Sequence, residues 1–301
     1  MAPDNKHLNL SAGIASVSVA VILVLAKLWA LAATGALSVA ASLVDSGLDL
    51  MVSLAGLAAI TYAARPPDED HAFGHSSAED LAALGQALFI IISGLVIGAA
   101  AIRRLVTPVP LPEREGAGIA VMVLSIVLTI GLVLWQRRVA RITGNRVVRA
   151  DSLHYLGDLV PNIGAILALA ASAYLGLGQI DSVVALGAAA ILIVGAARIG
   201  KQALDALMDR SAPPEMVAGI ERIARNFPGV LGFHDLKTRT AGSRVFVNLH
   251  IELDGTQTLD AAHAIGAGLR RAIIAAYPQA DVLIHKDPIG VDPHPDDPTK
   301  R

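Results

Sequence analysis

Residues 36–62 read ALSVAASLVDSGLDLMVSLAGLAAITY, an apolar stretch that contains two aspartates. A helix of about 20 apolar residues crosses the hydrocarbon core of a bilayer, so this stretch is long enough to span a membrane. Asp45 and Asp49 lie four residues apart, which puts both carboxylates on one helix face. Ionisable side chains cost roughly 2.5 kcal/mol or more each inside a membrane and usually serve a function there. The stretch therefore predicts a membrane helix with a functional polar face.

The whole chain has the composition of a membrane protein. Of its 301 residues, 54% are hydrophobic and 17% are charged, and the mean hydropathy is +0.58. A soluble domain carries about a quarter charged residues. Six stretches are long enough to span a bilayer: 10–33, 36–62, 81–102, 116–135, 151–175 and 180–203. The sequence therefore predicts an all-α, six-helix transmembrane domain in residues 1–210.

A second domain follows, because charged residues are spread throughout the chain beyond Met208. The apolar spacing predicts helices at 213–226 and 259–277 and strands at 230–239, 244–253 and 280–285. This α-β-β-α-β order predicts a small α+β domain in residues 211–291, with its helices on one face of the sheet. The Pro- and Asp-rich end, residues 292–301, is expected to be disordered.

Basic residues beside the predicted spans indicate the orientation, since cytoplasmic loops are enriched in Lys and Arg. With the N-terminus inside, the inner segments hold Lys6, Arg65, Arg137, Arg138, Arg141, Arg146, Arg149 and Lys201. The outer ends hold Arg103, Arg104 and Arg114, against this rule. The balance predicts a multi-pass protein of the cytoplasmic (inner) membrane with both termini in the cytoplasm. A net charge of −2 gives no support to a nucleic-acid partner.

The fifth predicted span repeats the spacing of the second, with His154 and Asp158 four residues apart. Together with Asp45 and Asp49, these residues would supply four nitrogen and oxygen ligands, which suits tetrahedral zinc. The chain has no cysteine, so thiolate ligands are excluded. The alternative is that these side chains lie at helix ends and face water. Asp151 is expected to cap the N-terminus of the fifth helix instead of binding metal.

Two further clusters of metal-ligand residues lie outside the predicted spans. The loop after the second span contains Asp68, His71 and His75, which could hold a metal together with a water molecule. In the second domain the candidate ligands are His234, His250, His263, His285 and Asp287, which could converge on two metals bridged by Asp287. The alternative for both clusters is ordinary loop or surface histidines.

Three other features carry less weight. Residues 195–201 fit G-x-x-x-x-G-K, but Gln202 replaces the Ser or Thr of a phosphate-binding loop, so we expect no nucleotide. Gly94 and Gly98 form a G-x-x-x-G pattern that either marks close helix packing or arises by chance. Lys27 is a charge within the first predicted span, and the sequence assigns it no role.

Together these motifs resemble those of the cation diffusion facilitators, in particular the bacterial zinc and ferrous-iron efflux type. The resemblance covers nearly the whole chain. It is carried by segments 42–49 (SLVDSGLD), 71–75 (HAFGH), 154–158 (HYLGD), 234–239 (HDLKTR) and 285–288 (HKDP).

The resemblance implies a homodimer, a metallochaperone-like second domain and three metal sites. The transport site would be Asp45, Asp49, His154 and Asp158, the loop site Asp68, His71 and His75, and the cytoplasmic binuclear site His234, His250, His263, His285 and Asp287. Leu153 matches a position linked to a hydrophobic gate. Ser77 replaces a family lysine that pairs with an aspartate matching Asp209, so this interlock between subunits is absent here.

The expected function is therefore that of a secondary active transporter, not an enzyme. It would export divalent transition metals, zinc first, from the cytoplasm in exchange for protons, and zinc ions would also occupy the regulatory site. The alternatives are export of ferrous iron, manganese, cobalt or cadmium, or a membrane metal sensor that does not transport. An ATP-driven pump is excluded, because roughly 80 soluble residues without a phosphate-binding loop cannot form a nucleotide domain.

Overall fold

The computed structural model describes residues 3–34, 37–106, 116–157, 159 and 180–290. They form two compact units, Asp4–Leu204 and a C-terminal unit that begins at Asp205. The first unit is entirely helical, and the second combines helices with a three-stranded sheet. This is the predicted fold class, a helical domain followed by a small α+β domain.

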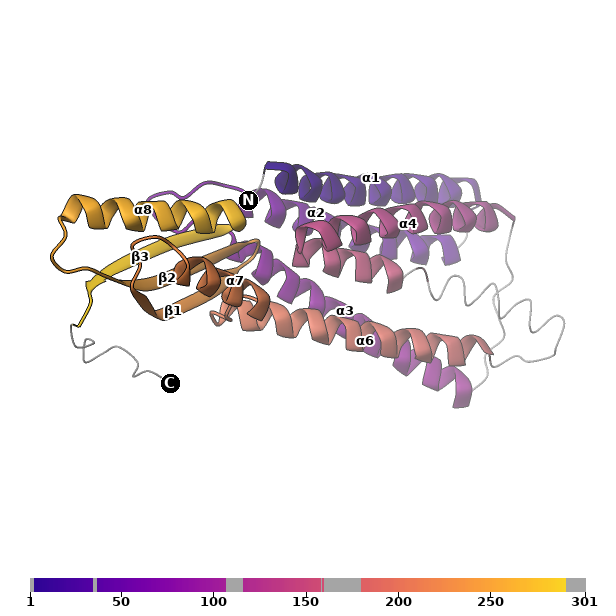
Figure 1. Cartoon of the computed structure of the whole chain (residues 1–301). Coiled ribbons are helices and arrows are strands. Elements are labelled where there is room, and N and C mark those ends of the chain that lie inside the picture. The colour runs from indigo at the N-terminus through magenta and orange to yellow at the C-terminus, as the bar shows by residue number, and fades with distance from the viewer. Residues whose placement is uncertain (1–2, 35–36, 107–115, 158, 160–179, 291–301) are drawn as a thin grey trace. The chain divides into compact units, whose positions relative to one another are not determined.

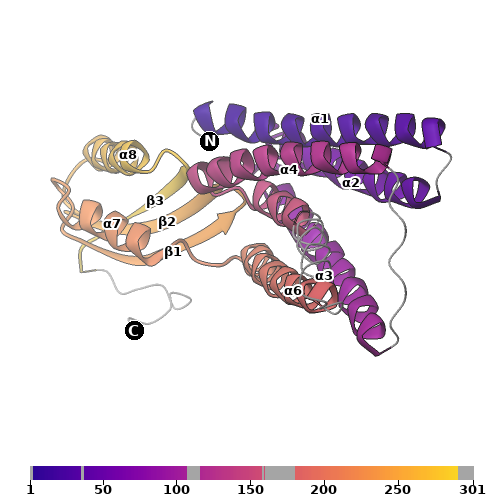
Figure 2. The same ribbon diagram turned by 90° about the vertical axis from the view of Figure 1, so that its right-hand side faces the viewer.

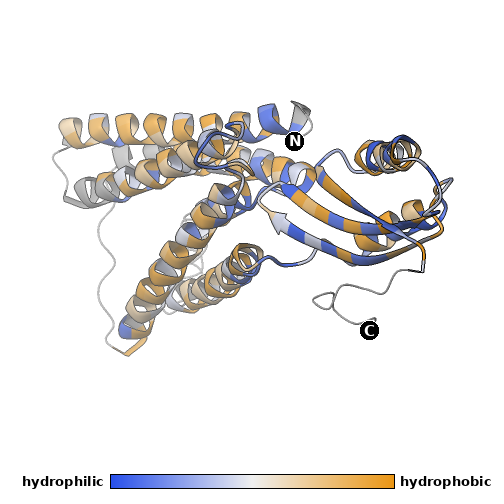
Figure 3. Ribbon diagram, turned by 90° about the vertical axis from the view of Figure 1, so that its left-hand side faces the viewer, coloured by the Kyte–Doolittle hydropathy of each residue, from blue (hydrophilic) through white to orange (hydrophobic). Residues whose placement is uncertain are grey.

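The helices of the first unit are α1 (Pro3–Thr34), α2 (Leu37–Ala63), α3 (Ser77–Val106), α4 (Gly116–Thr143) and α6 (Ile180–Leu207) (Figure 1). In the described chain, these five are long and apolar enough to cross a membrane. Most of the length of these helices consists of apolar residues (Figure 3). Five of the six predicted spans therefore correspond to helices. Of the fifth span, residues 151–157 are helical and most of the remainder lies outside the described residues.

The helix that contains His154 begins earlier than predicted. Residues 146–157 are helical, and the Val148 N–H donates to the Asn145 side chain over 3.0 Å. Asn145 therefore caps this helix, directly after α4 ends at Thr143. The prediction that Asp151 is the cap was wrong, because Asp151 lies inside the helix, where its buried carboxylate accepts a hydrogen bond from the Gln136 side chain.

Close contact between α3 and α6 depends on Gly94. A Cβ on Gly94 would lie 2.8 Å from the side chain of Ile193, closer than real Cβ atoms approach other atoms. Gly98 lies against Ala189 in the same contact. The G-x-x-x-G pattern therefore marks a tight helix pair, as small residues often do in membrane proteins.

The C-terminal unit contains α7 (Pro214–Arg225), β1 (Gly232–Ala241), β2 (Arg244–Leu253), α8 (Leu259–Ala276) and β3 (Ala280–Pro288) (Figure 2). The strand order is β1-β2-β3, with β1 antiparallel and β3 parallel to β2. The parallel pair requires a crossover, which α8 supplies. Gly242 and Ser243 join β1 to β2, and Gly242 has a φ of 54°, as a tight hairpin turn requires.

The two faces of the sheet differ in polarity. Val245, Val247, Leu249 and Ile251 are buried in one core with residues of α7 and α8, which confirms the predicted alternation along β2. The intervening residues of β2 are largely polar, and hydrophilic and hydrophobic colours alternate along the strand (Figure 3). Strand geometry directs these intervening side chains to the opposite face. The described helices of the C-terminal unit, α7 and α8, pack on the other face, which leaves this face available for polar side chains.

Candidate metal centres

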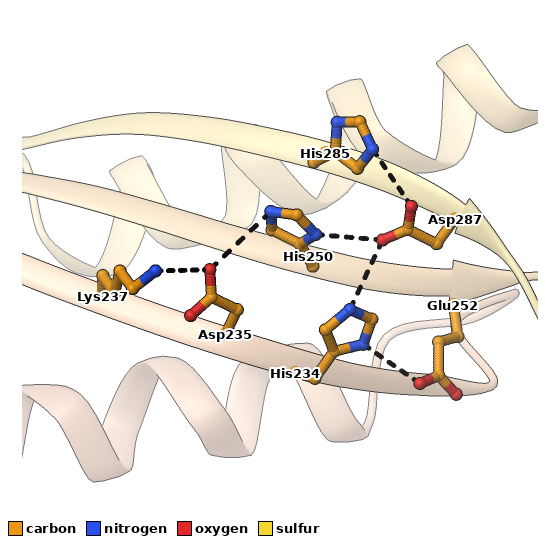
Figure 4. Close-up of polar contacts among 7 residues, drawn as sticks. All are labelled: His234, Asp235, Lys237, His250, Glu252, His285 and Asp287. Carbon is orange, nitrogen blue, oxygen red and sulfur yellow. Dashed lines mark hydrogen bonds and ion pairs between the residues drawn. The ribbon is translucent and has the colours of Figure 1, made fainter. Parts of the chain in front are cut away.

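Three histidines lie in a row across the open face of the sheet. His234 on β1 pairs in register with His250 on β2, and His250 pairs with His285 on β3 (Figure 4). Their neighbouring rings lie 5.2 Å and 4.6 Å apart, measured between centroids. Each strand thus contributes one imidazole to the same row, as the sequence predicted from its one histidine per strand.

Asp287 joins these histidines through both of its carboxylate oxygens. Oδ2 lies 3.0 Å from His250 Nδ1 and 3.5 Å from His234 Nε2, and Oδ1 lies 3.0 Å from His285 Nε2. Ligand atoms of His234, His250 and Asp287 all lie within 4.8 Å of one another. Two imidazoles and a carboxylate within this distance fit one zinc-like ion. The second carboxylate oxygen, facing His285, could reach a second ion.

Glu252, which the sequence reading missed, orients His234. Its Oε1 accepts a hydrogen bond from His234 Nδ1 over 3.1 Å, which leaves Nε2 directed towards Asp287. Gly232 on β1 is the cross-strand partner of Glu252 on β2, and a Cβ at this position would collide with the Glu252 carboxylate. A carboxylate that holds the far nitrogen of a metal-ligating histidine fixes its tautomer and ring orientation.

Asp235 was also missed, because it follows His234 and strict alternation places it on the other face. A bulge shifts the register between His234 and Lys237, and Asp235 has a φ of 47°. Its carboxylate consequently lies 4.0 Å from His250 Nε2 and 2.8 Å from Lys237 Nζ (Figure 4).

His263 does not join this cluster within one chain. It is exposed on α8, and α8 packs on the face of the sheet opposite the histidine row. Lys286, between two of the candidate ligands, lies against Gly266 of α8 and therefore points away from the row.

The loop between α2 and α3 brings Asp68, His71 and His75 together. Asp68 Oδ1 lies 3.3 Å from His71 Nδ1, and Asp68 Oδ2 lies 3.1 Å from His75 Nε2. Ligand atoms of all three residues fall within 4.8 Å of one another. The His71 backbone N–H donates to the Asp68 carboxylate and lowers its pKa below the usual 3.8. The carboxylate is thus kept charged, as a metal ligand must be.

In the membrane unit, the structure joins one residue from each predicted ligand pair. His154 Nε2 lies 3.0 Å from Asp49 Oδ1, and the imidazole is buried beside the rings of Phe89 and Tyr155. Asp45 is exposed one turn earlier on α2. Asp158 lies outside the described residues. The structure therefore shows one contact between the two predicted ligand pairs, and the four-residue site stays a prediction.

Polar side chains extend this contact along α2. Ser53, one turn beyond Asp49, lies 2.9 Å from the Tyr155 hydroxyl and accepts a hydrogen bond from Ser16 of α1 over 2.9 Å. All three hydroxyl residues are buried. On the other side of Asp49, Lys27 of α1 donates to Ser46 over 2.6 Å. Hydrogen bonds among buried side chains thus fix the register of α1, α2 and the His154 helix.

The structure shows the contacts of two further residues that the sequence analysis named, Leu153 and Asp209. Leu153, at the position that the resemblance links to a hydrophobic gate, packs against α6 where Gly195 leaves room, since a Cβ on Gly195 would lie 2.9 Å from the Leu153 side chain. Asp209 forms an ion pair with Arg239 over 3.3 Å within its own unit. Asp209 therefore has a partner although Ser77 replaces the family lysine.

Comparisons with known proteins cover both units. Residues 13–208 match the model of the cation efflux transmembrane domain, and residues 212–289 match the cytoplasmic domain of cation efflux proteins. The chain is 40% identical over 290 residues to the cation-efflux pump FieF of Cronobacter sakazakii, covering 96% of each chain. It is 41% identical over 282 residues to FieF of Citrobacter koseri, covering 94% of this chain and 93% of that one.

Among solved structures, the zinc form of CzrB is 34% identical, with 29% of this chain and 99% of that chain aligned at a TM-score of 0.27. The family models together extend over most of the chain, and the FieF relatives match along nearly their full length. The protein therefore belongs to the cation diffusion facilitator family, whose members are multi-pass membrane transporters and not enzymes.

Proposed function

We propose that this protein exports a divalent transition metal, zinc first, from the cytoplasm in exchange for protons. The observation that carries the proposal is the contact of Asp49, on a helix apolar enough to cross a membrane, with His154 on the helix of residues 146–157. Partly buried ionisable groups are expensive in a membrane and mark ion pathways there. The names of the full-length relatives, cation-efflux pumps, support the direction of transport.

Asp45, Asp49, His154 and Asp158 would form the transport site. One imidazole and three carboxylates form a ligand set without sulfur that suits a borderline ion such as zinc. Because divalent ions follow a common order of affinity at such a site, ferrous iron, cadmium and manganese remain alternative cargoes.

Protons would compete with the metal for the same atoms. In the structure, the contact between His154 and Asp49 is a hydrogen bond that requires a proton between nitrogen and oxygen. A metal ion on these two atoms excludes the proton between them: an imidazolium would release its Nε2 proton when the metal binds, and protons that return to His154 and Asp49 would eject the metal. Alternating access of the site to the two sides would then couple the two fluxes.

The C-terminal unit would act as a cytoplasmic metal sensor in a homodimer. The ligands would be His234, His250, His263, His285 and Asp287, with His263 supplied by the second chain, since one chain does not bring it to the row. The loop residues Asp68, His71 and His75 would form a third site. We assign residues 1–210 to the membrane domain, 211–291 to the cytoplasmic domain and 292–301 to a tail, with both termini in the cytoplasm.

Metal uptake into proteoliposomes containing the purified protein tests this function. Zinc, ferrous iron, cadmium and manganese would be compared for the wild type and for His154→Ala. We expect zinc uptake that responds to pH in the wild type and little uptake in the variant. If metal exchange in His154→Ala still depends on pH, His154 does not couple the proton flux to the metal flux. A protein that binds these metals but moves none of them would be the membrane sensor instead.

A further inference from the structure

A basic cleft lies where α4 meets the His154 helix. Its volume is about 440 Å³, and its lining residues are Arg137, Ala140, Arg141, Arg149, Ser152 and Leu153. Three of the six are arginines and none is acidic. Because the chain turns at Gly144, residues 137–141 of α4 face residues 149–153 of the next helix across this cleft.

The three arginines have no acidic partner in the described chain. Arg137 and Arg141 form no ion pair there, and Arg149 donates only to the neutral side chain of Gln202, over 3.0 Å. Arg146, one turn before Arg149, is in contrast paired with buried Asp80. Like charges gathered in one cleft repel one another unless an anion compensates them. The cleft thus has the charge of an anion site and no anion of its own.

The position along α4 matches the membrane interface. Val127 and Leu134 are exposed apolar residues of α4, at 61% and 63% of their accessible surface. The partly exposed Trp135 follows, and the first arginine of the cleft stands two residues later. Tryptophan is enriched at the level of lipid headgroups, and arginine extends from there towards phosphates. The cleft therefore begins where the apolar face of α4 ends.

We propose that this cleft binds the phosphate of an anionic phospholipid headgroup. Arg137, Arg141 and Arg149 would contact its oxygens, since guanidinium groups bind phosphate through paired hydrogen bonds. Exposed Val127 and Leu134 would contact the acyl chains, which favours a lipid over a soluble phosphate. Basic pockets between membrane helices on the cytoplasmic side are known to take such headgroups.

The site has a direct connection to the transport machinery. Leu153 lines the cleft and immediately precedes His154, whose side chain meets Asp49. A bound headgroup would hold the helix turn that presents His154. This consequence rests on the proposed transport function, whereas lipid binding itself does not depend on it.

Native mass spectrometry of the full-length protein in mild detergent tests the proposal. Equal amounts of phosphatidylglycerol and phosphatidylcholine would be added, and the retained lipids counted. We expect phosphatidylglycerol to be retained preferentially, with a loss of about fivefold in relative affinity for Arg141→Gln or Arg137→Gln. Arg138→Gln is the matched control, because Arg138 is exposed on the same turn of α4 but does not line the cleft.

Equal retention of the two lipids would overturn the proposal, as would a loss in Arg138→Gln as large as that in Arg141→Gln. Glycerol phosphate, added as a soluble competitor, separates the two sources of phosphate. If it displaces the lipid at micromolar concentration, the site is one for soluble phosphates and the lipid assignment is wrong. Failure of metal transport would leave these lipid measurements unchanged, so the two proposals fail separately.

Discussion

The imidazole of His154 lies 3.0 Å from the carboxylate of Asp49, a residue 105 positions earlier in the chain. This contact joins α2 to the helix of residues 146–157, and each helix contributes one ionisable side chain to it. One turn along α2, Ser53 and the Tyr155 hydroxyl form a second contact of 2.9 Å between the same helices. Neither Ser53 nor Tyr155 belongs to the predicted ligand set, so we expect this second contact to position the first.

Tyr155→Phe should weaken the transport site without removing any ligand. The change deletes one hydroxyl from a buried network and costs about 1 kcal/mol of stability. We expect lower zinc affinity at the transport site with unchanged affinity at the cytoplasmic site, measured by zinc titration against a competing chelator. Tyr62→Phe is the control, because the Tyr62 ring contacts His75 and Arg65, and its hydroxyl forms no hydrogen bond with the described residues. Equal affinities for Tyr155→Phe and the wild type would contradict the positioning role.

Glu252→Ala should lower the metal affinity of the centre formed by His234, His250 and Asp287 by about 10- to 100-fold. Loss of a partner that orients a metal ligand usually has an effect of this size. Gly232→Ala should have a smaller effect, because its Cβ would meet Oε2 of Glu252, at the flexible end of the side chain, whereas Oε1 bonds to His234. Glu252→Gln retains an acceptor oxygen and should lose less. If Glu252→Ala binds zinc as tightly as the wild type, Glu252 does not act through His234. Titration of the full-length protein with zinc measures all three.

The loop centre should respond to pH through Asp68. Its pKa lies below 3.8 because the His71 N–H stabilises the charged carboxylate. A lowered pKa means that the hydrogen-bonded turn is fully stabilised above 3.8 and lost only as the pH falls through the lowered value. Carboxyl NMR of labelled aspartate in detergent-solubilised protein should show Asp68 titrating below 3.8. Titration at or above 3.8 would show that the turn does not form.

Gly94→Ala and Gly85→Ala form a matched pair on α3. A Cβ at Gly94 would lie 2.8 Å from Ile193 of α6, whereas a Cβ at Gly85 meets no described atom within 4 Å. Overpacking typically costs about 1–3 kcal/mol, whereas Gly→Ala in an open helix gains about 0.5–1 kcal/mol. In thermal unfolding in detergent, Gly94→Ala should therefore lower the midpoint temperature and Gly85→Ala should raise it. Equal midpoints would mean that α3 and α6 do not pack through Gly94.

The sequence predicted those features that depend on a regular period or on length. Apolar length located the membrane helices, and alternation located the buried face of β2. Spacing of four residues placed two candidate ligands on one face of each helix, and the structure shows one contact between these faces, from Asp49 to His154. Glu252 was within reach of the same reasoning, since it stands two residues after His250 on one strand face.

The position of Asp235 and the start of the His154 helix depend on local departures from the regular strand and helix patterns, so the sequence did not predict them. The bulge after His234 turns Asp235 to the histidine face, and nothing in strict alternation indicates it. The helix of His154 starts at a polar capping residue, Asn145, before the apolar stretch that marks the membrane span. Membrane hydropathy locates the span but not the helix end, so Asp151 was assigned to the wrong position.

The central claim is that protons and metal exchange at the site containing Asp49 and His154. The most direct test is zinc uptake into proteoliposomes under an imposed pH gradient, comparing the wild type with Asp49→Ala. The account predicts gradient-dependent uptake in the wild type and its loss in the variant. Zinc uptake that ignores the gradient, or that is as fast in Asp49→Ala as in the wild type, would contradict it.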